Sequence, residues 1–311
     1  MKIGYPCINL TLGCKSDRTF RLKSYSEPRL IETGANNLDC LGQILRWNVE
    51  RNILFFRITS DLVPFASHPV CRFDWVGHFQ ETFRCLGEYI RAHQIRISMH
   101  PDPFTLINSQ DEAIFERSHR ELLYHAQVLD AMQLDRTAKI QIHVGGVYGD
   151  RVASLRRFIE RFGRLDPAVR NRLVVENDEK SYPLHDCLAI HEGTGVPILL
   201  DVFHHSILNH GEDLPACLAK TTPTWTPRDG LPMVDYSTQA VGKPTGSHTA
   251  SLDIEDFQAF LARTRPYDFD LMLEIKDKEA SAQKAITLAR KDNRFTIPDD
   301  SSVTSVSSPA L

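Results

Sequence analysis

The stretch PILLDVFHH, residues 197–205, determines how the rest of the chain is interpreted. Its first half is typical of a buried β-strand, and a strand that belongs only to a core usually ends in turn residues such as Gly, Asn or Pro. Here the strand is followed by Asp201, His204 and His205, whose side chains are all of types that bind metal ions. If other strands end in the same way, these residues belong to a shared site and not to a single turn.

Seven further apolar runs alternate with longer segments of helical spacing. The eight predicted strands cover residues 2–5, 53–58, 96–99, 139–144, 173–175, 196–200, 232–236 and 270–273. Strands that alternate with helices pair in parallel, and eight such units close into an α/β fold of the (β/α)8 TIM barrel type. An open doubly wound sheet is the alternative. We expect a single barrel domain over residues 1–298 and a disordered Ser-rich tail at 299–311.

The composition excludes several classes of protein. Hydrophobic residues make up 42% of the chain, but none of the apolar runs approaches the roughly 20 residues that span a bilayer. The opening sequence MKIGYPCINLTLG lacks the apolar core of a signal peptide, so we expect a cytoplasmic protein without a membrane partner. Seven cysteines without a CxxC pair are not a disulfide framework. Because the net charge is −4, binding of nucleic acid would require a local basic patch.

Metal-ligating residue types recur where the predicted strands end. In addition to Asp201, they are His100, His143, Glu176, Asp235 and Glu274. The ends of barrel strands converge on one face, and burying so many charges there is costly unless a metal ion compensates them. His204 lies three residues after Asp201 and can face the same pocket, whereas we expect His205 to be structural. His68 and His248 lie in loops, where the residue pattern alone leaves their roles open.

The ligand types indicate the chemistry. Imidazoles and carboxylates without cysteine favour Mn, Zn or Fe over the all-oxygen shells of Mg and Ca. The candidates outnumber what one ion needs, which indicates two or three cations. Such clusters hold both the attacking and the leaving oxygen of a phosphate group, so phosphodiester hydrolysis is the expected reaction. Sugar isomerisation on a two-metal barrel is the alternative, and it would normally use a Lys or an acid to move protons beside the sugar.

A basic loop supplies the local patch that nucleic acid would need. The sequence CKSDRTFRLKSY, residues 14–25, follows the first predicted strand and includes Lys15 and Arg18 with Phe20 and Tyr25 interleaved. On the face that carries the metals, such a loop can hold phosphates while its aromatic rings stack on bases. A solvated charged loop without a ligand is the alternative interpretation.

Taken together, these motifs resemble the UV damage endonucleases, a DNA-repair family on an endonuclease IV-like TIM barrel. The matching motifs, in chain order, are GYPCINLTLG, LVPFASHPV, SMHP, HVGGVYGD, VVENDEK, LLDVFHH, GSHT and LEIKDKE. The resemblance implies a metal-dependent enzyme that nicks damaged double-stranded DNA immediately 5′ to UV photoproducts, with other lesions as further candidates, and leaves a 3′-hydroxyl and a 5′-phosphate. It implies two or three divalent cations, with Mn²⁺ favoured over Zn²⁺ or Mg²⁺. We expect a monomer.

Three alternatives remain beside this resemblance: an apurinic-site endonuclease of the endonuclease IV class, a TIM-barrel sugar isomerase or epimerase, and a metal-binding protein that recognises damaged DNA without cutting it. The ligands that the resemblance implies are His68, His100, His143, Glu176, Asp201, His204, His248 and Glu274. We expect Glu176, Glu274 and His143 to be catalytic. Tyr5 and Asn9 match family residues placed against the lesion or the scissile region.

Two positions depart from the family pattern. The seventh strand of better-known members has Lys-x-His, in which the lysine is modified and the histidine is a ligand. This chain has Met233 and Asp235 there, and we expect Asp235 to be a ligand and Met233 not to be one. After SMHP the family often has a Gln-Tyr pair that probes the damaged bases, where this chain has Pro103 and Phe104. The predicted DNA-binding residues are therefore Tyr5, Asn9, Lys15, Arg18, Pro103 and Phe104.

Overall fold

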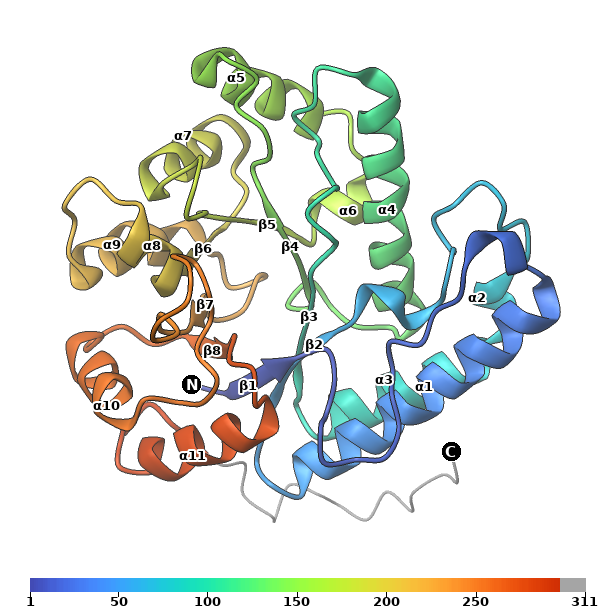
Figure 1. The fold of residues 1–311 in the computed structure, drawn as a ribbon, viewed down its shortest axis with the longest axis horizontal. Coiled ribbons are helices and arrows are strands. Elements are labelled where there is room, and N and C mark those ends of the chain that lie inside the picture. The colour runs from blue at the N-terminus through green and yellow to red at the C-terminus, as the bar shows by residue number, and fades with distance from the viewer. Residues whose placement is uncertain (297–311) are drawn as a thin grey trace.

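A computed structural model describes residues 1–296, and the tail predicted at 299–311 lies outside the described residues. Eight parallel strands close into a barrel in chain order (Figure 1). They are β1 (Ile3–Pro6), β2 (Phe55–Ile58), β3 (Arg96–Met99), β4 (Lys139–His143), β5 (Leu173–Glu176), β6 (Ile198–Asp201), β7 (Met233–Tyr236) and β8 (Asp270–Leu273). Because β8 pairs with β1, the predicted TIM barrel is confirmed and the open sheet is excluded.

Helices surround the barrel on its outside (Figure 1). The longer ones are α1 (Glu27–Val49), α3 (Gln80–Ala92), α4 (Glu112–Ala131), α5 (Arg151–Phe162), α7 (Leu184–Thr194), α9 (Leu214–Thr221), α10 (Ile254–Arg263) and α11 (Glu279–Ala289). The shorter ones are α2 (Trp75–His78), α6 (Pro167–Arg170) and α8 (Val202–Ile207), with 3-10 turns at η1 (Leu22–Ser24), η2 (Ser60–Leu62) and η3 (Thr222–Thr224). Several begin at an Asp whose carboxylate accepts a bond from an unpaired backbone N–H, as Asp111 does for α4.

The barrel interior consists of layers, because every second residue of a strand points inward. The middle layer is apolar and includes Phe55, Val174, Leu199, Trp225, Met233 and Met272. Two residues further along each strand, the inward side chains are polar, so Asp235 lies one layer above Met233. Charged side chains therefore lie above this apolar layer, at the C-terminal end of the barrel, and also below it, where Arg96, Lys139 and Asp270 are buried at the N-terminal end.

One disulfide joins two segments that the sequence analysis did not connect. Cys14 in the basic loop is bonded to Cys40 in α1, with their Cα atoms 5.7 Å apart. The other five cysteines are free, so the expectation that the chain has no disulfide framework holds apart from this one bond. Within residues 1–296, the helices are too short or too polar to cross a membrane.

Candidate metal centre

Three groups of side chains at the C-terminal ends of the strands place donor atoms within 4.8 Å of one another. The groups are His100, His143 and Glu176; Glu176, Asp201 and His204; and Asp201, Asp235 and Glu274. Because Glu176 and Asp201 each belong to two groups, the seven side chains form one continuous set, which we call the ligand array. The convergence of strand ends therefore brings together seven of the predicted ligands.

Backbone carbonyl groups orient three histidines of this region, whereas Nδ1 of His143 is buried without a hydrogen-bond partner. Nδ1 of His100 lies 2.7 Å from the carbonyl oxygen of the next residue, and Nδ1 of His204 lies 3.0 Å from that of Asn177. His248, in the loop after β7, has Nδ1 2.8 Å from the Glu274 carbonyl oxygen. A carbonyl oxygen only accepts, so each Nδ1 donates and each Nε2 is left as the atom that can bind a cation. Histidines that bind metals are commonly held in this way.

Glu176 lies at the centre of the ligand array and is only 1% exposed. Its Oε2 lies 3.4 Å from Nε2 of His100 and 3.9 Å from Nε2 of His143, and its Oε1 lies 3.2 Å from Nδ1 of His204. Gln141 donates a hydrogen bond to Oε2 from inside the barrel. Although burial favours the neutral acid, the imidazoles of His143, His100 and His204 hold the pKa of Glu176 well below its usual range. An ionised carboxylate shared by two groups is suited to bridge two cations.

Arg57 is a buried member of the site that the sequence analysis did not identify as functional. It lies at the end of β2, is 3% exposed and directs its guanidinium into the barrel. Nη2 donates to Oδ2 of Asp235 at 2.6 Å and to Oε1 of Gln141 at 2.8 Å, and Nη1 donates to Glu274. Arginine is not a metal ligand, so a search for ligand types passes over it. An inward-facing charge at the end of a barrel strand is the signal that could have identified it.

The donor set fits divalent cations. Oδ2 of Asp201 and Oδ1 of Asp235 are buried without a hydrogen-bond partner, which is costly for a carboxylate. Burial raises the pKa of Asp201 well above its usual range, and it raises that of Asp235 to about 7 although Arg57 opposes it. Burial also disfavours ionised Glu274, but Arg57 lowers its pKa to about 2. Two buried carboxylates and the half-buried Glu274 this close would need more positive charge than Arg57 carries for all to be ionised, and divalent cations would supply it.

We expect cation binding to release protons and to weaken as the pH falls. Burial opposes the charged imidazole, but Asp201 and Glu176 raise the pKa of His204 to about 11. His204 therefore carries a proton at neutral pH, and Asp235, with its pKa raised to about 7, carries one in part; the raised pKa of Asp201 acts in the same direction, so a cation would displace protons from the site. Calorimetric titration with Mn²⁺ in two buffers of different ionisation enthalpy measures this release. Heats that are the same in both buffers, with one affinity at pH 6 and pH 8, would contradict the prediction.

The other predicted histidines differ in their placement. His248 borders the ligand array, with Nε2 3.8 Å from Oε2 of Glu274. His68 is exposed in the loop after η2, where its Nδ1 accepts a bond from the Val70 amide, and it is outside the three groups. His205 is buried against Cys217, with Nε2 3.2 Å from Sγ, which is consistent with a structural role.

The predicted DNA-binding residues divide into buried and exposed sets. Tyr5 is completely buried, with its hydroxyl between Asn48 Oδ1 at 2.7 Å and Asn9 Nδ2 at 2.8 Å. The Asn9 Oδ1 accepts bonds from backbone amides at Thr11 and Leu12. In this conformation Tyr5 and Asn9 shape the loop after β1 and present almost no surface to DNA.

The remaining four DNA-binding candidates are exposed around the mouth of the barrel. Lys15 and Arg18 line a hollow of about 470 Å³ together with Phe20 in the basic loop. Pro103 is exposed in the loop after β3, and Phe104 in the same loop has 73% of its surface accessible. Cationic and aromatic side chains are therefore exposed in loops that follow strands, on the same side of the barrel as the ligand array.

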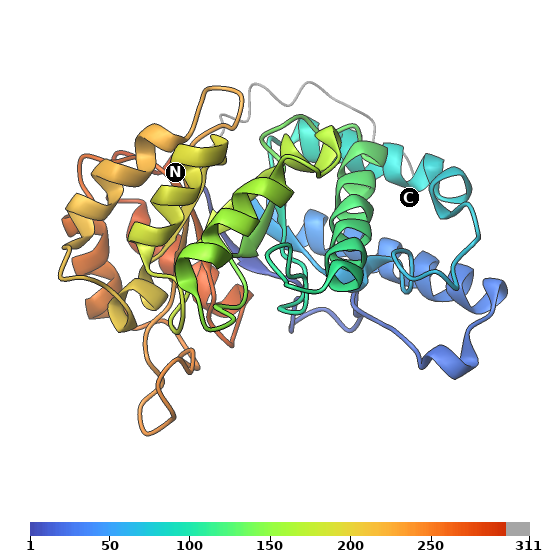
Figure 2. The same cartoon turned by 90° about the horizontal axis from the view of Figure 1, so that it is seen from above.

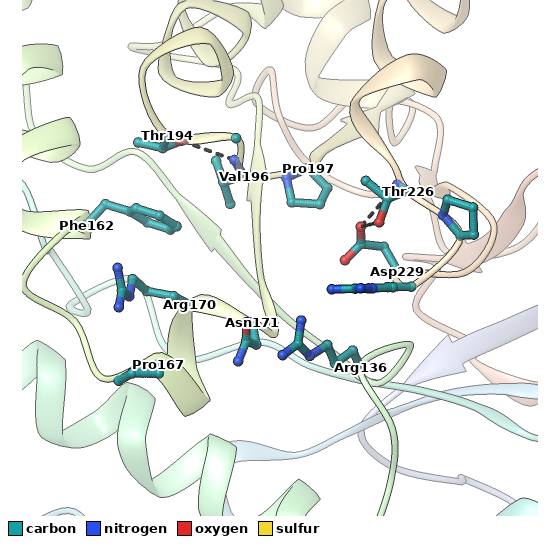
Figure 3. Close-up of a pocket in the computed structure, with 13 residues that line it drawn as sticks. Arg136, Phe162, Pro167, Arg170, Asn171, Thr194, Val196, Pro197, Thr226 and Asp229 are labelled. Atoms are coloured by element: carbon teal, nitrogen blue, oxygen red, sulfur yellow. Dashed lines mark hydrogen bonds between the residues drawn. The ribbon is translucent and has the colours of Figure 1, made fainter.

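Two clefts differ in their relation to the ligand array. A cleft of about 340 Å³ is lined by His100, His143, Gly145 and Lys180, so it opens directly onto the array. A larger cleft of about 690 Å³ lies among segments that precede the strands, around Arg136 and Arg170 at the opposite end of the barrel (Figure 3). It includes none of the predicted ligands. The chemistry of the side chains therefore locates the site, and the size of a cleft does not.

Comparisons with known proteins point to one family. Residues 1–299 match the family described as UV-endonuclease UvdE. A UV DNA damage endonuclease of Clostridium perfringens is 35% identical over 296 residues, which cover 94% of this chain and 72% of that protein. The crystal structure of SacUVDE has 42% sequence identity and a TM-score of 0.91, and the match covers 95% of this chain and all of that one. Endonuclease IV of Thermus thermophilus, at 15% identity and a TM-score of 0.58, covers 81% of this chain and 93% of that one and shares the fold.

Proposed function

Because the chain belongs to the UV-endonuclease UvdE family and is therefore a DNA repair endonuclease, we propose that it uses the ligand array to cut damaged DNA. The proposed cut lies immediately 5′ to a UV photoproduct in double-stranded DNA and leaves a 3′-hydroxyl and a 5′-phosphate. The observation that carries this proposal is the array itself, in which buried carboxylate oxygens of Asp201 and Asp235 have no partner beside the imidazoles.

The proposed cofactor is a set of two or three divalent cations, Mn²⁺ in preference to Zn²⁺ or Mg²⁺. Bound divalent cations neutralise phosphate charge and lower the pKa of coordinated water. The residues that would hold them are His100, His143, Glu176, Asp201, His204, Asp235, His248 and Glu274, with His68 as a further candidate whose loop would have to bring it closer. Asp235 would bind a cation through Oδ1, because Arg57 already donates to its Oδ2.

The side chains of this chain have separate tasks in the proposed reaction. Glu176 keeps a negative charge between His204 and the pair His100 and His143, so it would hold cations on both sides of its carboxylate. Arg57 orients the carboxylate of Glu274 from below the array, and His143 borders the cleft through which a phosphate group would enter. The exposed cations of the basic loop would hold the flanking phosphates.

The decisive experiment compares end-labelled duplexes that contain a cyclobutane photodimer, an abasic site or no lesion. The protein is incubated with each duplex and Mn²⁺, and the product ends are tested with a ligase and a phosphatase. We expect a single cut 5′ to the photodimer and no cut in undamaged DNA. Cleavage restricted to the abasic duplex would replace this proposal with an apurinic-site activity, and binding without cleavage would leave a recognition protein.

Phe104 is the proposed damage probe. Its ring is 73% exposed and follows His100 by four residues, so it lies beside the array and can fill the space left when damaged bases unstack. We expect Phe104→Ala to weaken binding to photodimer duplex about tenfold and binding to undamaged duplex by much less. Fluorescence anisotropy without added metal measures both affinities. Equal losses on the two duplexes would show that the ring contributes only non-specific contact.

A further inference from the structure

The segment between β7 and α10 extends away from the barrel on the side of the ligand array. It forms the orange loop that projects furthest in Figure 2. Residues 238–249 fold back on themselves, because the Ala240 amide donates to the Ser247 carbonyl at 2.7 Å and the Thr249 amide donates to the Thr238 carbonyl at 2.9 Å. We call residues 238–249 the β7 hairpin. An isolated antiparallel bridge between Gln239 and His248 lies between these two bonds.

The turn of the β7 hairpin is held from inside by one side chain. The side-chain nitrogen Nε2 of Gln239 donates to the backbone carbonyl oxygens of Ala240, Lys243 and Pro244 at 3.0–3.3 Å. The Gln239 amide oxygen accepts a bond from the Gly246 amide at 2.9 Å. These four bonds satisfy backbone groups that a loose loop would leave to water. The tip therefore has a defined shape before any ligand binds, which reduces the entropy lost on binding.

The tip carries an apolar and a cationic side chain. Val241 is 99% exposed, and Lys243 is exposed two residues further on. In residues 1–296, eight large hydrophobic side chains are exposed: Leu10, Leu22, Phe104, Tyr148, Val152, Leu231, Val241 and Ile254. Among these eight, only Leu231 precedes a strand, while the others lie in segments that follow strands or begin the next helix. Exposed apolar surface thus gathers on the side of the ligand array.

The base of the β7 hairpin is part of the site. His248, which pairs with Gln239 near the end of the hairpin, donates through Nδ1 to the Glu274 carbonyl at 2.8 Å, and its ring centre lies 5.1 Å from that of Phe203. The amide of Lys276, beyond β8, donates to the Thr249 carbonyl at 3.2 Å. The tip is therefore held at a set position relative to the ligand array.

We propose that the β7 hairpin is a second DNA-contacting element, in which Val241 enters a groove of the duplex beside the lesion and Lys243 contacts a backbone phosphate. The inference rests on the proposed function. A single small apolar side chain on a thin projection is too little for a protein interface, but proteins that kink DNA commonly insert an apolar side chain of this kind between base steps. Damaged steps unstack at lower cost, so the valine contact should favour damaged duplex, whereas the lysine contact should not depend on damage.

The test uses Val241→Ser and Lys243→Gln, with Leu231→Ser and Lys291→Gln as matched controls at the opposite end of the barrel. Single-turnover nicking of a photodimer duplex is measured against protein concentration, together with anisotropy on photodimer and undamaged duplexes and metal content by elemental analysis. We expect Val241→Ser to raise the half-saturating concentration about tenfold while the maximal rate and the metal content stay unchanged. Lys243→Gln should weaken binding to both duplexes and reduce the slope of affinity against salt by about one.

Either variant can give a meaningful negative result, because both side chains are exposed and their replacement leaves the fold intact. Half-saturating concentrations equal to those of the two controls would overturn the proposal. A loss of metal in Val241→Ser would also overturn it, because the hairpin would then act only by supporting His248. If the wild-type protein nicks none of the duplexes, the proposed function fails, and anisotropy on damaged and undamaged duplexes still decides whether the hairpin binds DNA.

Discussion

Glu176→Gln should reduce the rate of nicking at a photodimer by at least about a thousandfold, because it removes a charge that two groups of donor atoms share. Glutamine keeps the shape of the side chain but cannot balance the imidazoles of His100 and His143, which lie 3.4 Å and 3.9 Å from Oε2. Without that carboxylate, the two groups of donor atoms would hold cations less tightly. The DNA-contacting residues lie in separate loops, so affinity for DNA should be largely retained.

Three measurements check this expectation: the single-turnover rate, the metal content by elemental analysis and the affinity for damaged duplex by anisotropy. Glu192→Gln is the matched control. Glu192 is exposed on α7, so this substitution makes the same chemical change outside the array. We expect the metal content to fall with the rate in Glu176→Gln only. A rate near that of the wild-type protein would remove Glu176 from the centre of the site.

Arg57→Met should destabilise the metal-free protein by about 3–5 kcal/mol, and added cations should recover much of that loss. The guanidinium is the partner of Asp235 Oδ2 and of Glu274, so its removal leaves one buried and one half-buried carboxylate without a compensating charge. Methionine occupies a similar volume and introduces no charge. A divalent cation can take over the vacated carboxylate oxygens, so the variant should also bind more metal than the wild-type protein.

The free energy of unfolding in EDTA and in Mn²⁺, with the metal stoichiometry, tests this prediction. Arg96→Met is the matched control. Arg96 is also buried and pairs with Asp270 at 3.4 Å, but at the N-terminal end of the same barrel, away from the ligand array. Arg96→Met should lower the free energy of unfolding by the same amount in EDTA and in Mn²⁺. If Arg57→Met behaves in the same way, the guanidinium is only a structural partner and does not compete with a cation for Asp235.

The same geometry refines what is expected of the seventh strand. Met233 packs into the apolar middle layer, as the sequence predicts for a residue that does not bind metal. Asp235 belongs to the ligand array, but Arg57 and Gln141 already donate hydrogen bonds to its Oδ2 at 2.6 Å and 2.7 Å. Only Oδ1 has no partner, so a cation would be held through one oxygen unless the guanidinium moves. The role of Asp235 as a ligand stays a prediction.

Local pattern was sufficient to determine the barrel and most of the ligand array. Apolar runs mark the strands, and the alternation of inward and outward side chains explains why Asp235 and Met233 lie in different layers on the same side of the strand. The convergence of strand ends then brings His100 and Glu274 to one site, although 174 residues separate them in the sequence. None of these steps requires knowledge of which side chains touch.

Contacts across the barrel were decided only by the tertiary structure. The guanidinium of Arg57 meets Gln141, Asp235 and Glu274, which are 84, 178 and 217 residues away in the chain. The burial of Tyr5 against Asn48 likewise joins separate elements. A strand's own sequence determines the period of its side chains through backbone geometry. Which of those side chains meet depends on the register between strands and on packing, and those are set only when the barrel closes.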